Sequence, residues 1–363
     1  MKISVYAICK NEAQFAARWA ASMQEADQVV VLDTGSTDDT VQILRQAGVQ
    51  VYEEKIEPWR FDAARNRALE LVDADTDLCV CTDLDEVFSG PWRHLVEQAW
   101  TPDVSWIRCR FVWSFQPDGS EGLVYWHTRM HSRHGFRWVH PVHEALECDW
   151  KGRVVDLQGV QLLHYSDPDK PRAQYLPLLE LAVQEEPESD RNVHYLGREY
   201  FFHGRWDDCI TTLQYHLQMP SAKWVEERCA SMRYIGQAYL AKGEPKAAEN
   251  WFLRACAESP GLREPWLGLA KSGYDQKDWE LVAWAARRCL QITARSSTYV
   301  TEADAWGAAP HDYLALGLFY TGRRREALQA AEQAAALAPW DARLEQNRKL
   351  IADAVEQSEE HKK

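Results

Sequence analysis

Two acidic residues, Asp83 and Asp85, close an apolar stretch that reads Leu-Cys-Val-Cys-Thr-Asp-Leu-Asp-Glu over residues 78–86. The apolar residues predict a buried strand. Two residues separated by one position on an extended chain point to the same side. Two carboxylates on one side, at the carboxyl end of a strand, suit a hard divalent cation that bridges phosphate groups. The pair therefore predicts a metal site; the structural alternative is a pair of helix-capping acids.

The segments around this pair alternate between strand and helix over the first 90 residues. The pattern predicts strands at 3–8, 29–32, 49–52 and 78–82, and helices at 13–23, 36–47 and 61–72. Ser36 and Asp39 have the spacing of a capping box at the second helix. This order predicts a largely parallel sheet with helices on both faces. Asp33 and Asp83 then lie at the carboxyl ends of strands, where such sheets bind ligands.

The rest of the chain changes character twice. Residues 104–165 contain strand-like segments at 104–113, 122–130 and 154–164, which we expect to be antiparallel strands completing the site. From about residue 173 the chain is helical and repeats every 34 residues or so. Copies open near Leu196, Trp266 and Leu316, and the clearest resembles the tetratricopeptide pattern at Ile235, Gly236, Tyr239, Gly243, Ala248, Phe252, Ala255 and Pro260. An unrelated helical bundle is the alternative.

Composition limits the possible functions. The chain has 363 residues, enough for about two domains, and a net charge of −14, which argues against general binding to nucleic-acid backbones. Nine scattered cysteines without a metal-site or disulfide-like spacing indicate reduced thiols and a cytoplasmic location. Residues 1–9 read as a strand rather than a signal peptide, and no apolar run is long enough to cross a membrane.

Five motifs occur together in the N-terminal half: Cys9-Lys10-Asn11-Glu12, Asp33-Thr34-Gly35-Ser36-Thr37-Asp38, Phe61-Asp62-x-x-Arg65-Asn66, Asp83-Leu84-Asp85-Glu86 and His143-Glu144. In this order they resemble the family-2-type glycosyltransferases of the GT-A fold, specifically bacterial ones that carry tetratricopeptide repeats. The resemblance implies an α/β GT-A domain at 1–172, a linking helix at 173–190, an all-α repeat domain at 191–345 and a charged tail at 346–363.

The resemblance also implies roles for single residues. Asp85 would ligate the metal, with Asp83 facing both metal and ribose and His164 as a further ligand. Asp33, Arg65, Lys10 and Glu12 would belong to the nucleotide site. Glu144, beside His143, would be the general base. Basic residues at Lys170-Pro171-Arg172 would close over the diphosphate.

Alternatives stay open for several of these residues. Arg65 could form a surface salt bridge, and His164 could be an ordinary half-buried histidine. Family members often carry a second Asp where this chain has Thr34, so the base of the nucleotide is open. The five histidines between 127 and 143 could form a zinc site, although their spacing fits no common zinc motif.

The expected function is metal-dependent, inverting transfer of a sugar, of the hexosyltransferase type, from a nucleoside-diphosphate sugar. UDP-sugar is the expected donor and Mn²⁺ or Mg²⁺ the expected ion. The acceptor could be a saccharide, a lipid-linked glycan or a peptide, and the repeats would bind the acceptor or a protein partner. One alternative is a non-catalytic tetratricopeptide scaffold with a degenerate nucleotide-binding domain. A further alternative is a nucleotidyltransferase. Such an enzyme normally has a glycine-rich loop after the first strand, whereas this chain has Lys10-Asn11-Glu12-Ala13 there, without a glycine.

Overall fold

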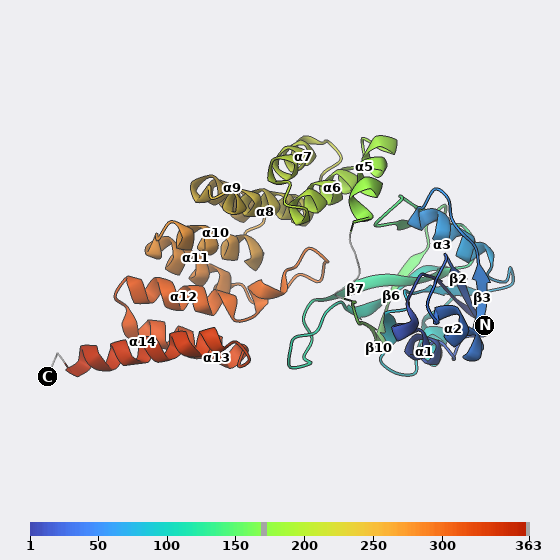
Figure 1. The fold of residues 1–363 in the computed structure, drawn as a ribbon, viewed down its shortest axis with the longest axis horizontal. Coiled ribbons are helices and arrows are strands. Elements are labelled where there is room, and N and C mark those ends of the chain that lie inside the picture. Colours follow the sequence, from blue (N-terminus) through green and yellow to red (C-terminus); the bar gives the residue numbers. More distant parts are fainter. Residues whose placement is uncertain (168–172, 361–363) are drawn as a thin grey trace. The chain divides into compact units, whose positions relative to one another are not determined.

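The computed structural model describes residues 1–167 and 173–360. The chain separates into two compact units, Met1–Ala182 and Val183–Lys363. The first contains a sheet with helices packed on it, and the second consists of helical hairpins (Figure 1). The predicted fold class, an α/β domain followed by an all-α repeat domain, is confirmed.

An eight-stranded sheet in the order β3-β2-β1-β4-β7-β6-β10-β5 organises the first unit. Its strands are β1 (Ile3–Cys9), β2 (Gln28–Asp33), β3 (Gln50–Glu53), β4 (Leu78–Cys81), β5 (Glu86–Phe88), β6 (Val104–Val112), β7 (Val124–Ser132) and β10 (Arg153–His164). The strands β3, β2, β1 and β4 are parallel, and β7 runs antiparallel to both β4 and β6. The carboxyl ends of β2, β1 and β4 therefore meet at one edge.

One expected pairing is wrong. We predicted only antiparallel strands between residues 104 and 165, but β10 runs parallel to β6, with Arg153 opposite Val104. The reason is the connection: a small hairpin of β8 (Phe136–Val139) and β9 (Ala145–Cys148) intervenes, and the chain returns to the end of the sheet at which β6 begins. This direction carries the last residue of β10, His164, to the edge where β4 ends.

Alternating side chains on the central strands build two apolar layers. Ile3, Val5 and Ala7 pack with the buried face of α1 (Ala13–Ser22), together with residues of α2 (Thr40–Gln46) and α4 (Arg93–Ala99). Tyr6 and Ile8 face the opposite way, toward α3 (Phe61–Glu70). The period of two in a strand thus places helices on both faces, as predicted.

The helix that we expected to start at Ser36 starts instead at Thr40. The predicted capping box is wrong. The N-cap residue of the observed helix is Asp39, and its side chain makes no capping hydrogen bond. Ser36 Oγ instead accepts a hydrogen bond from the backbone N–H of Asn11, 2.8 Å away, and Ser36 donates to Asp33. These polar residues therefore fix the loop after β2 to the loop after β1.

A chain of buried hydrogen bonds runs through the second apolar layer. The Trp138 indole donates to Tyr6 Oη at 2.8 Å, and Tyr6 Oη lies 2.8 Å from His131 Nε2. His131 Nδ1 lies 2.8 Å from the carbonyl of Ser132. Burial lowers the pKa of His131 to about 4, so this histidine is neutral in the folded protein near neutral pH.

We expect the N-terminal unit to lose stability in mild acid because of His131. The unfolded chain binds a proton near pH 6.5, whereas the folded chain does so only near pH 4. Stability is therefore lost as the pH falls from 6.5 toward 4. From pH 7 to pH 5 this histidine should account for about 2 kcal/mol of the free energy of unfolding. Urea denaturation at both pH values should show a smaller loss for His131→Gln than for the wild type. The exposed control His94→Gln should behave like the wild type, and equal losses in wild type and His131→Gln would contradict the prediction.

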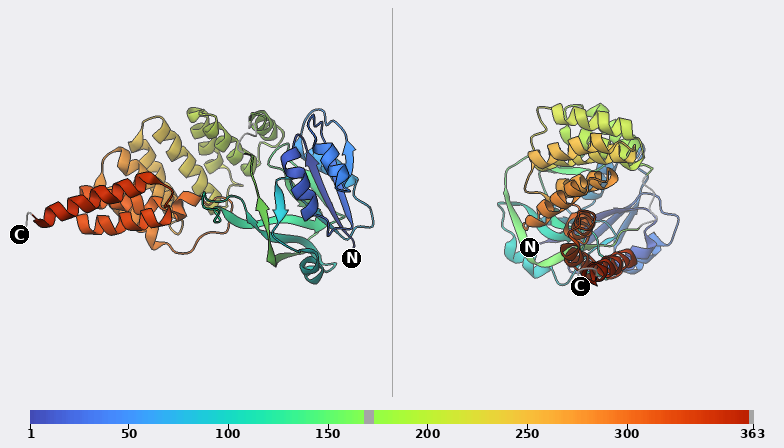
Figure 2. Two further views of the ribbon diagram at one scale, coloured as in Figure 1. Left: turned by 60° about the horizontal axis from the view of Figure 1, so that its bottom comes forward. Right: turned by 90° about the vertical axis from the view of Figure 1, so that its left-hand side faces the viewer.

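The second unit is a series of helical hairpins, in which each predicted repeat copy forms one pair (Figures 1 and 2). A first helix, α5 (Tyr175–Glu185), straddles the boundary between the units. The others are α6 (Asp190–Phe202), α7 (Trp206–Gln218), α8 (Val225–Ala241), α9 (Pro245–Glu258), α10 (Arg263–Asp275), α11 (Trp279–Gln291), α12 (Ala309–Tyr320), α13 (Arg324–Leu337) and α14 (Ala342–Glu360).

Glycine allows neighbouring helices of the repeat unit to approach closely. A Cβ atom on Gly236 of α8 would lie 2.8 Å from the Phe252 ring of α9. A Cβ on Gly317 of α12 would lie 2.6 Å from the backbone nitrogen of Ala283 in α11. The glycines of the repeat pattern therefore serve packing and not chemistry.

Candidate active site

The residues after β4 turn sharply and bring three carboxylates together. The chain passes from Cys81 through Asp83 and Asp85 to Glu86, the first residue of β5. Because β5 pairs antiparallel with β10, Glu86 lies opposite His164. One carboxylate oxygen from each of Asp83, Asp85 and Glu86 lies within 4.8 Å of the others. The predicted acidic pair is thus part of a three-carboxylate group and caps no helix.

His164 approaches this group in an orientation suited to a metal ligand. Its Nε2 lies 3.5 Å from Asp85 Oδ2, and its Nδ1 lies 2.8 Å from the carbonyl of Trp113. The Trp113 ring stacks on the imidazole with ring centroids 4.4 Å apart. A histidine that donates one nitrogen to a backbone carbonyl presents the lone pair of the other, the arrangement usual in metal sites. Burial lowers the pKa of His164, but the Asp85 carboxylate more than offsets this effect, so the pKa rises.

Two arginines with largely buried side chains neutralise part of this negative charge. Arg65 of α3 donates to Asp83 Oδ1 at 2.8 Å and pairs with Glu144. Arg129 of β7 pairs with Glu86 and lies 3.5 Å from Asp83 Oδ2. Burial alone would lower the pKa of both guanidinium groups. Their carboxylate partners raise the pKa by more than burial lowers it, so both arginines stay charged.

Glu86 occupies the most buried position in this group. Only 1% of it is exposed, and its Oε2 accepts a hydrogen bond from the Asp83 backbone at 3.1 Å. Burial, supported by the charges of Asp83 and Asp85, raises the pKa of Glu86 to about 7, although Arg129 opposes the shift. The carboxylates of this site are those of Asp83, Asp85, Glu86 and Glu144. When all four are ionised, the guanidinium groups of Arg65 and Arg129 balance two of the charges, so an excess of two negative charges remains. A divalent cation would balance this excess.

The two residues expected at the acceptor side, Glu144 and His143, make different contacts. Glu144 lies within the charged group through Arg65, and its side chain is 12% exposed. His143 adopts a left-handed backbone conformation with φ of 48°, and its ring stacks on Tyr175 at 5.8 Å. The structure therefore joins Glu144 to the acidic group through Arg65, whereas the described ring contact of His143 is with Tyr175. Arg65 forms buried salt bridges with site residues rather than a surface salt bridge, and its contact with a nucleotide stays a prediction.

The other predicted nucleotide residues lie on the loops after β1 and β2. Asp33 is buried, and its Oδ1 accepts hydrogen bonds from Gly35 and Ser36 at 3.0 and 2.9 Å. Glu12 is buried at the start of α1, where its backbone N–H donates to Thr40 Oγ1 at 2.8 Å, whereas Lys10 is exposed. In this structure Asp33 stabilises its own loop, and its contact with a nucleotide stays a prediction. The proposed diphosphate-closing residues, 170–172, lie outside the described residues.

Sequence reasoning missed Arg129 and the stacking of Trp113 on His164. The strand register places Arg129: β7 pairs with β4, and Val80 lies opposite Met130. The preceding residue of β7 therefore lies near the carboxyl end of β4, beside the acidic turn. A charged residue inside a central strand could have been recognised as a partner for buried carboxylates. Trp113 lies 51 residues from His164, so no local pattern connects the two.

Comparisons with known proteins agree with this geometry. The sequence model described as Glycosyl transferase family 2 matches residues 4–149. An uncharacterised glycosyltransferase of Rickettsia prowazekii is 34% identical over 101 residues, which is 28% of this chain and 33% of that protein. One from Rickettsia felis is 46% identical over 59 residues, covering 16% and 20%. Residues 4–149 are thus a glycosyltransferase domain of the family 2 type, and tetratricopeptide-type repeats follow it.

Two further similar proteins are described as tetratricopeptide repeat proteins. A tetratricopeptide repeat-containing protein of Synechococcus elongatus is 32% identical over 105 residues, covering 28% of this chain and 25% of that protein. A tetratricopeptide protein structure from Thermus thermophilus aligns with 49% of this chain and 88% of its own, at 17% identity and a TM-score of 0.36. The chain spans between a fifth and a third of the length of the three curated relatives named here.

A segment of the chain itself covers part of the repeat surface. Tyr299 donates to Glu227 Oε2 at 2.9 Å, and the carbonyl of Val300 accepts from Arg233 at 2.7 Å. The Trp306 indole donates to Glu264 Oε1 at 3.0 Å. Residues 296–306 therefore lie along α8 and α10, so a ligand of this face would have to displace them.

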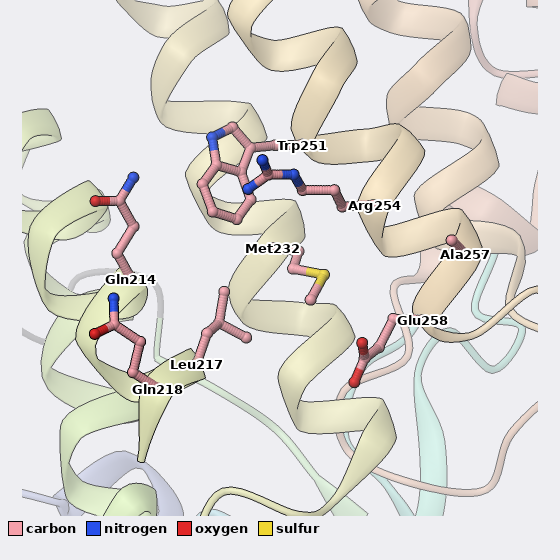
Figure 3. Close-up of a pocket in the computed structure, with 8 residues that line it drawn as sticks. All are labelled: Gln214, Leu217, Gln218, Met232, Trp251, Arg254, Ala257 and Glu258. Atoms are coloured by element: carbon pink, nitrogen blue, oxygen red, sulfur yellow. The ribbon is translucent and has the colours of Figure 1, made fainter.

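A groove with a volume of about 600 Å³ opens elsewhere on the repeats, on α7, α8 and α9 (Figure 3). Met232 and Trp251 contribute apolar surface, and Gln214, Arg254 and Glu258 contribute polar groups. Arg254 lies over the Trp251 ring, 4.6 Å from its centroid.

Among the described residues, no helix is both long enough and apolar enough to cross a membrane.

Proposed function

We propose that this protein transfers a sugar from a nucleoside-diphosphate sugar, with UDP-sugar as the expected donor, to an acceptor hydroxyl or other nucleophile with inversion at the sugar carbon. The observation that carries the proposal is the convergence of Asp85 and His164 beside Asp83 at the end of β4. The family 2 match over residues 4–149 supports it.

The residues present fit a divalent ion, and of the two expected ions Mn²⁺ fits better than Mg²⁺, because the imidazole of His164 is a nitrogen ligand. Asp85 and His164 would hold it, with Asp83 at the more exposed side, where its side chain is 34% exposed. A bound ion would neutralise negative charge on the departing diphosphate. The Trp113 carbonyl fixes the His164 ring, so the imidazole would meet an ion already oriented.

The protein side of the reaction requires a base for the acceptor. In the proposed single displacement, the acceptor oxygen bonds to the sugar carbon while the bond from that carbon to the phosphate oxygen breaks. The electron pair leaves with the diphosphate, and the acceptor proton passes to Glu144. Arg65 holds Glu144 and Asp83 on one guanidinium group, which fixes the base relative to the acidic turn.

The first test is metal-dependent donor binding. Calorimetry of the full chain with UDP, with and without Mn²⁺, should show binding that strengthens with the ion. A panel of UDP-sugars should then identify a donor that the protein hydrolyses slowly in the absence of acceptor. If neither UDP nor any sugar nucleotide binds with Mn²⁺ or Mg²⁺, the tetratricopeptide scaffold becomes the better explanation.

The repeats are proposed to bind the acceptor or a protein partner.

A separate prediction concerns the base. Glu144→Gln should lower kcat for transfer by about 10²–10⁴-fold, the usual contribution of a general base. The physical reason is that glutamine keeps the size of the side chain but cannot take up the acceptor proton. Glu147→Gln, an exposed neighbour paired with Arg137, is the matched control and should leave kcat unchanged. A Glu144→Gln variant with the kcat of the wild type would show that Glu144 is not the base.

A further inference from the structure

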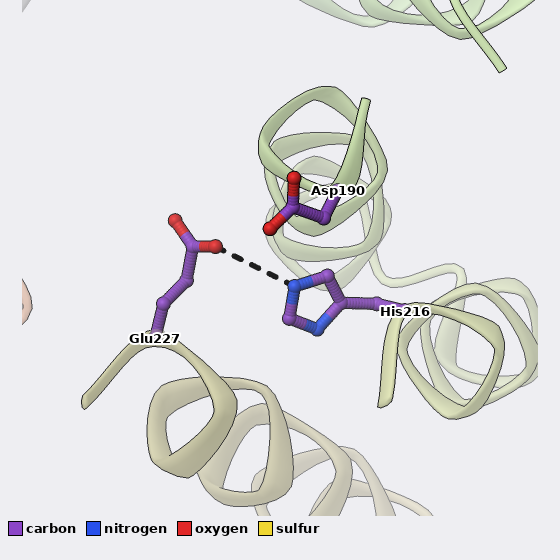
Figure 4. A group of neighbouring side chains, drawn as sticks. All are labelled: Asp190, His216 and Glu227. Atoms are coloured by element: carbon purple, nitrogen blue, oxygen red, sulfur yellow. Dashed lines mark ion pairs between the residues drawn. The ribbon is translucent and has the colours of Figure 1, made fainter. Parts of the chain in front are cut away.

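Three side chains with metal-binding atoms converge in the repeat unit. In the sequence they lie more than 100 residues after the acidic turn. Asp190 opens α6, His216 lies in the last turn of α7, and Glu227 lies in the first turn of α8. Consecutive helices of a hairpin array run antiparallel, so these three positions fall at the same end (Figure 4). One ligand atom from each residue lies within 4.8 Å of the other two.

His216 supplies an independent indication that something binds there. The residue is fully buried, and its Nε2 makes no hydrogen bond. Figure 4 shows the ring directed at the two carboxylates, with Nε2 3.5 Å from Glu227 Oε1. This separation exceeds that of an ordinary N–H···O hydrogen bond. A buried ring nitrogen that makes no hydrogen bond is costly, and a cation between the three groups would satisfy it.

The surrounding contacts orient the ligands. His216 Nδ1 lies 3.0 Å from Ser231 Oγ, which in turn lies 2.7 Å from His194 Nδ1. If His216 donates to the serine and the serine donates to His194, the Nε2 lone pair points at Asp190 and Glu227. Tyr299 donates to the other Glu227 oxygen at 2.9 Å. Supporting hydrogen bonds of this kind are typical around metal ligands.

We propose that Asp190, His216 and Glu227 bind a divalent transition-metal ion, with Zn²⁺ as the best match. One imidazole and two carboxylates are a donor set that Zn²⁺ accepts, and Mg²⁺ is disfavoured by the nitrogen ligand. The ion would join α6, α7 and α8 and, through Tyr299, the segment 296–306. The site is structural and independent of the proposed glycosyl transfer. The competing arrangement is a direct hydrogen bond between His216 and Glu227.

The experiment uses the full chain in an Asp85→Asn background, so that the acidic turn contributes less to metal binding. After chelator treatment, calorimetric titration with ZnCl₂ should detect a site in this protein. Adding Asp190→Asn should weaken that site by at least about tenfold, the smallest loss expected even for a supporting residue. Asp207→Asn is the control, because Asp207 also lies in a first helical turn, that of α7, and pairs with Lys242. It should leave the affinity unchanged.

Two further measurements keep the proposal falsifiable. Zn²⁺ should raise the Tm of the control protein and not that of the Asp190→Asn protein, because an ion that binds only the folded state stabilises it. Co²⁺ in place of Zn²⁺ should give visible absorption bands that Asp190→Asn abolishes. Equal Zn²⁺ affinity in Asp190→Asn and Asp207→Asn, or no Zn²⁺ binding at all in the Asp85→Asn protein, would overturn the proposal. Neither result would bear on UDP binding by the first unit.

Discussion

Replacing Asp85 with asparagine is expected to lower kcat/KM for sugar transfer by about 10²–10³-fold. Loss of an ion that stabilises the departing diphosphate removes several kcal/mol of transition-state stabilisation, and each 1.4 kcal/mol or so is a factor of ten. The change keeps the size of the side chain and removes one charged ligand beside His164. Calorimetry with UDP should show that the variant gains little affinity from Mn²⁺, whereas the wild type gains much.

The same variant should not be less stable than the wild type. Asp85 is buried beside Asp83 and Glu86, and its charge helps to raise the pKa of Glu86. Removing one of three crowded carboxylates relieves repulsion, a common trade between stability and function at active sites. Asp156→Asn, an exposed acid paired with Arg108, is the control for activity. If Mn²⁺ strengthens UDP binding equally in Asp85→Asn and wild type, Asp85 is not a metal ligand.

Replacing Arg129 with methionine is expected to lower the free energy of unfolding by about 3–5 kcal/mol, the usual cost of removing one member of a buried ion pair. Methionine roughly fills the space of the Arg129 stem but leaves Glu86, which is 1% exposed, without its cation. Chemical denaturation near pH 8, where Glu86 is largely ionised in the folded state, measures the loss.

A second substitution tests the reason for this loss. Adding Glu86→Gln to Arg129→Met removes the stranded charge and should restore much of the stability. Arg108→Met is the matched control from the neighbouring strand β6. Arg108 forms an exposed pair with Asp156, so its loss should cost about 0–1 kcal/mol. If Arg129→Met and Arg108→Met cost the same, or if Glu86→Gln restores nothing, the Glu86–Arg129 pair does not carry the effect.

Local patterns in the sequence were enough to predict the two-part architecture. Short apolar, strand-like runs located β1, β2, β4 and β6, and repeated glycine and alanine positions located the helical hairpins around Gly236. These features depend on residues close together in the sequence, so a pattern can report them. The predicted start of α2 failed for a tertiary reason, because Ser36 bonds to Asn11 across two strands instead of capping a helix.

The acidic pair was also visible from the sequence, because Asp83 and Asp85 adjoin a buried strand. What surrounds them was decided by the tertiary structure. Arg65, Arg129 and His164 reach the turn from three elements that lie between 18 and 79 residues away from their carboxylate partners. The parallel pairing of β10 with β6 brings His164 to this edge, and the pairing of β7 with β4 brings Arg129. Sequence spacing determines which side chains leave one strand on the same side, but strand pairing determines which charges meet, because it is set by the packing of the whole sheet.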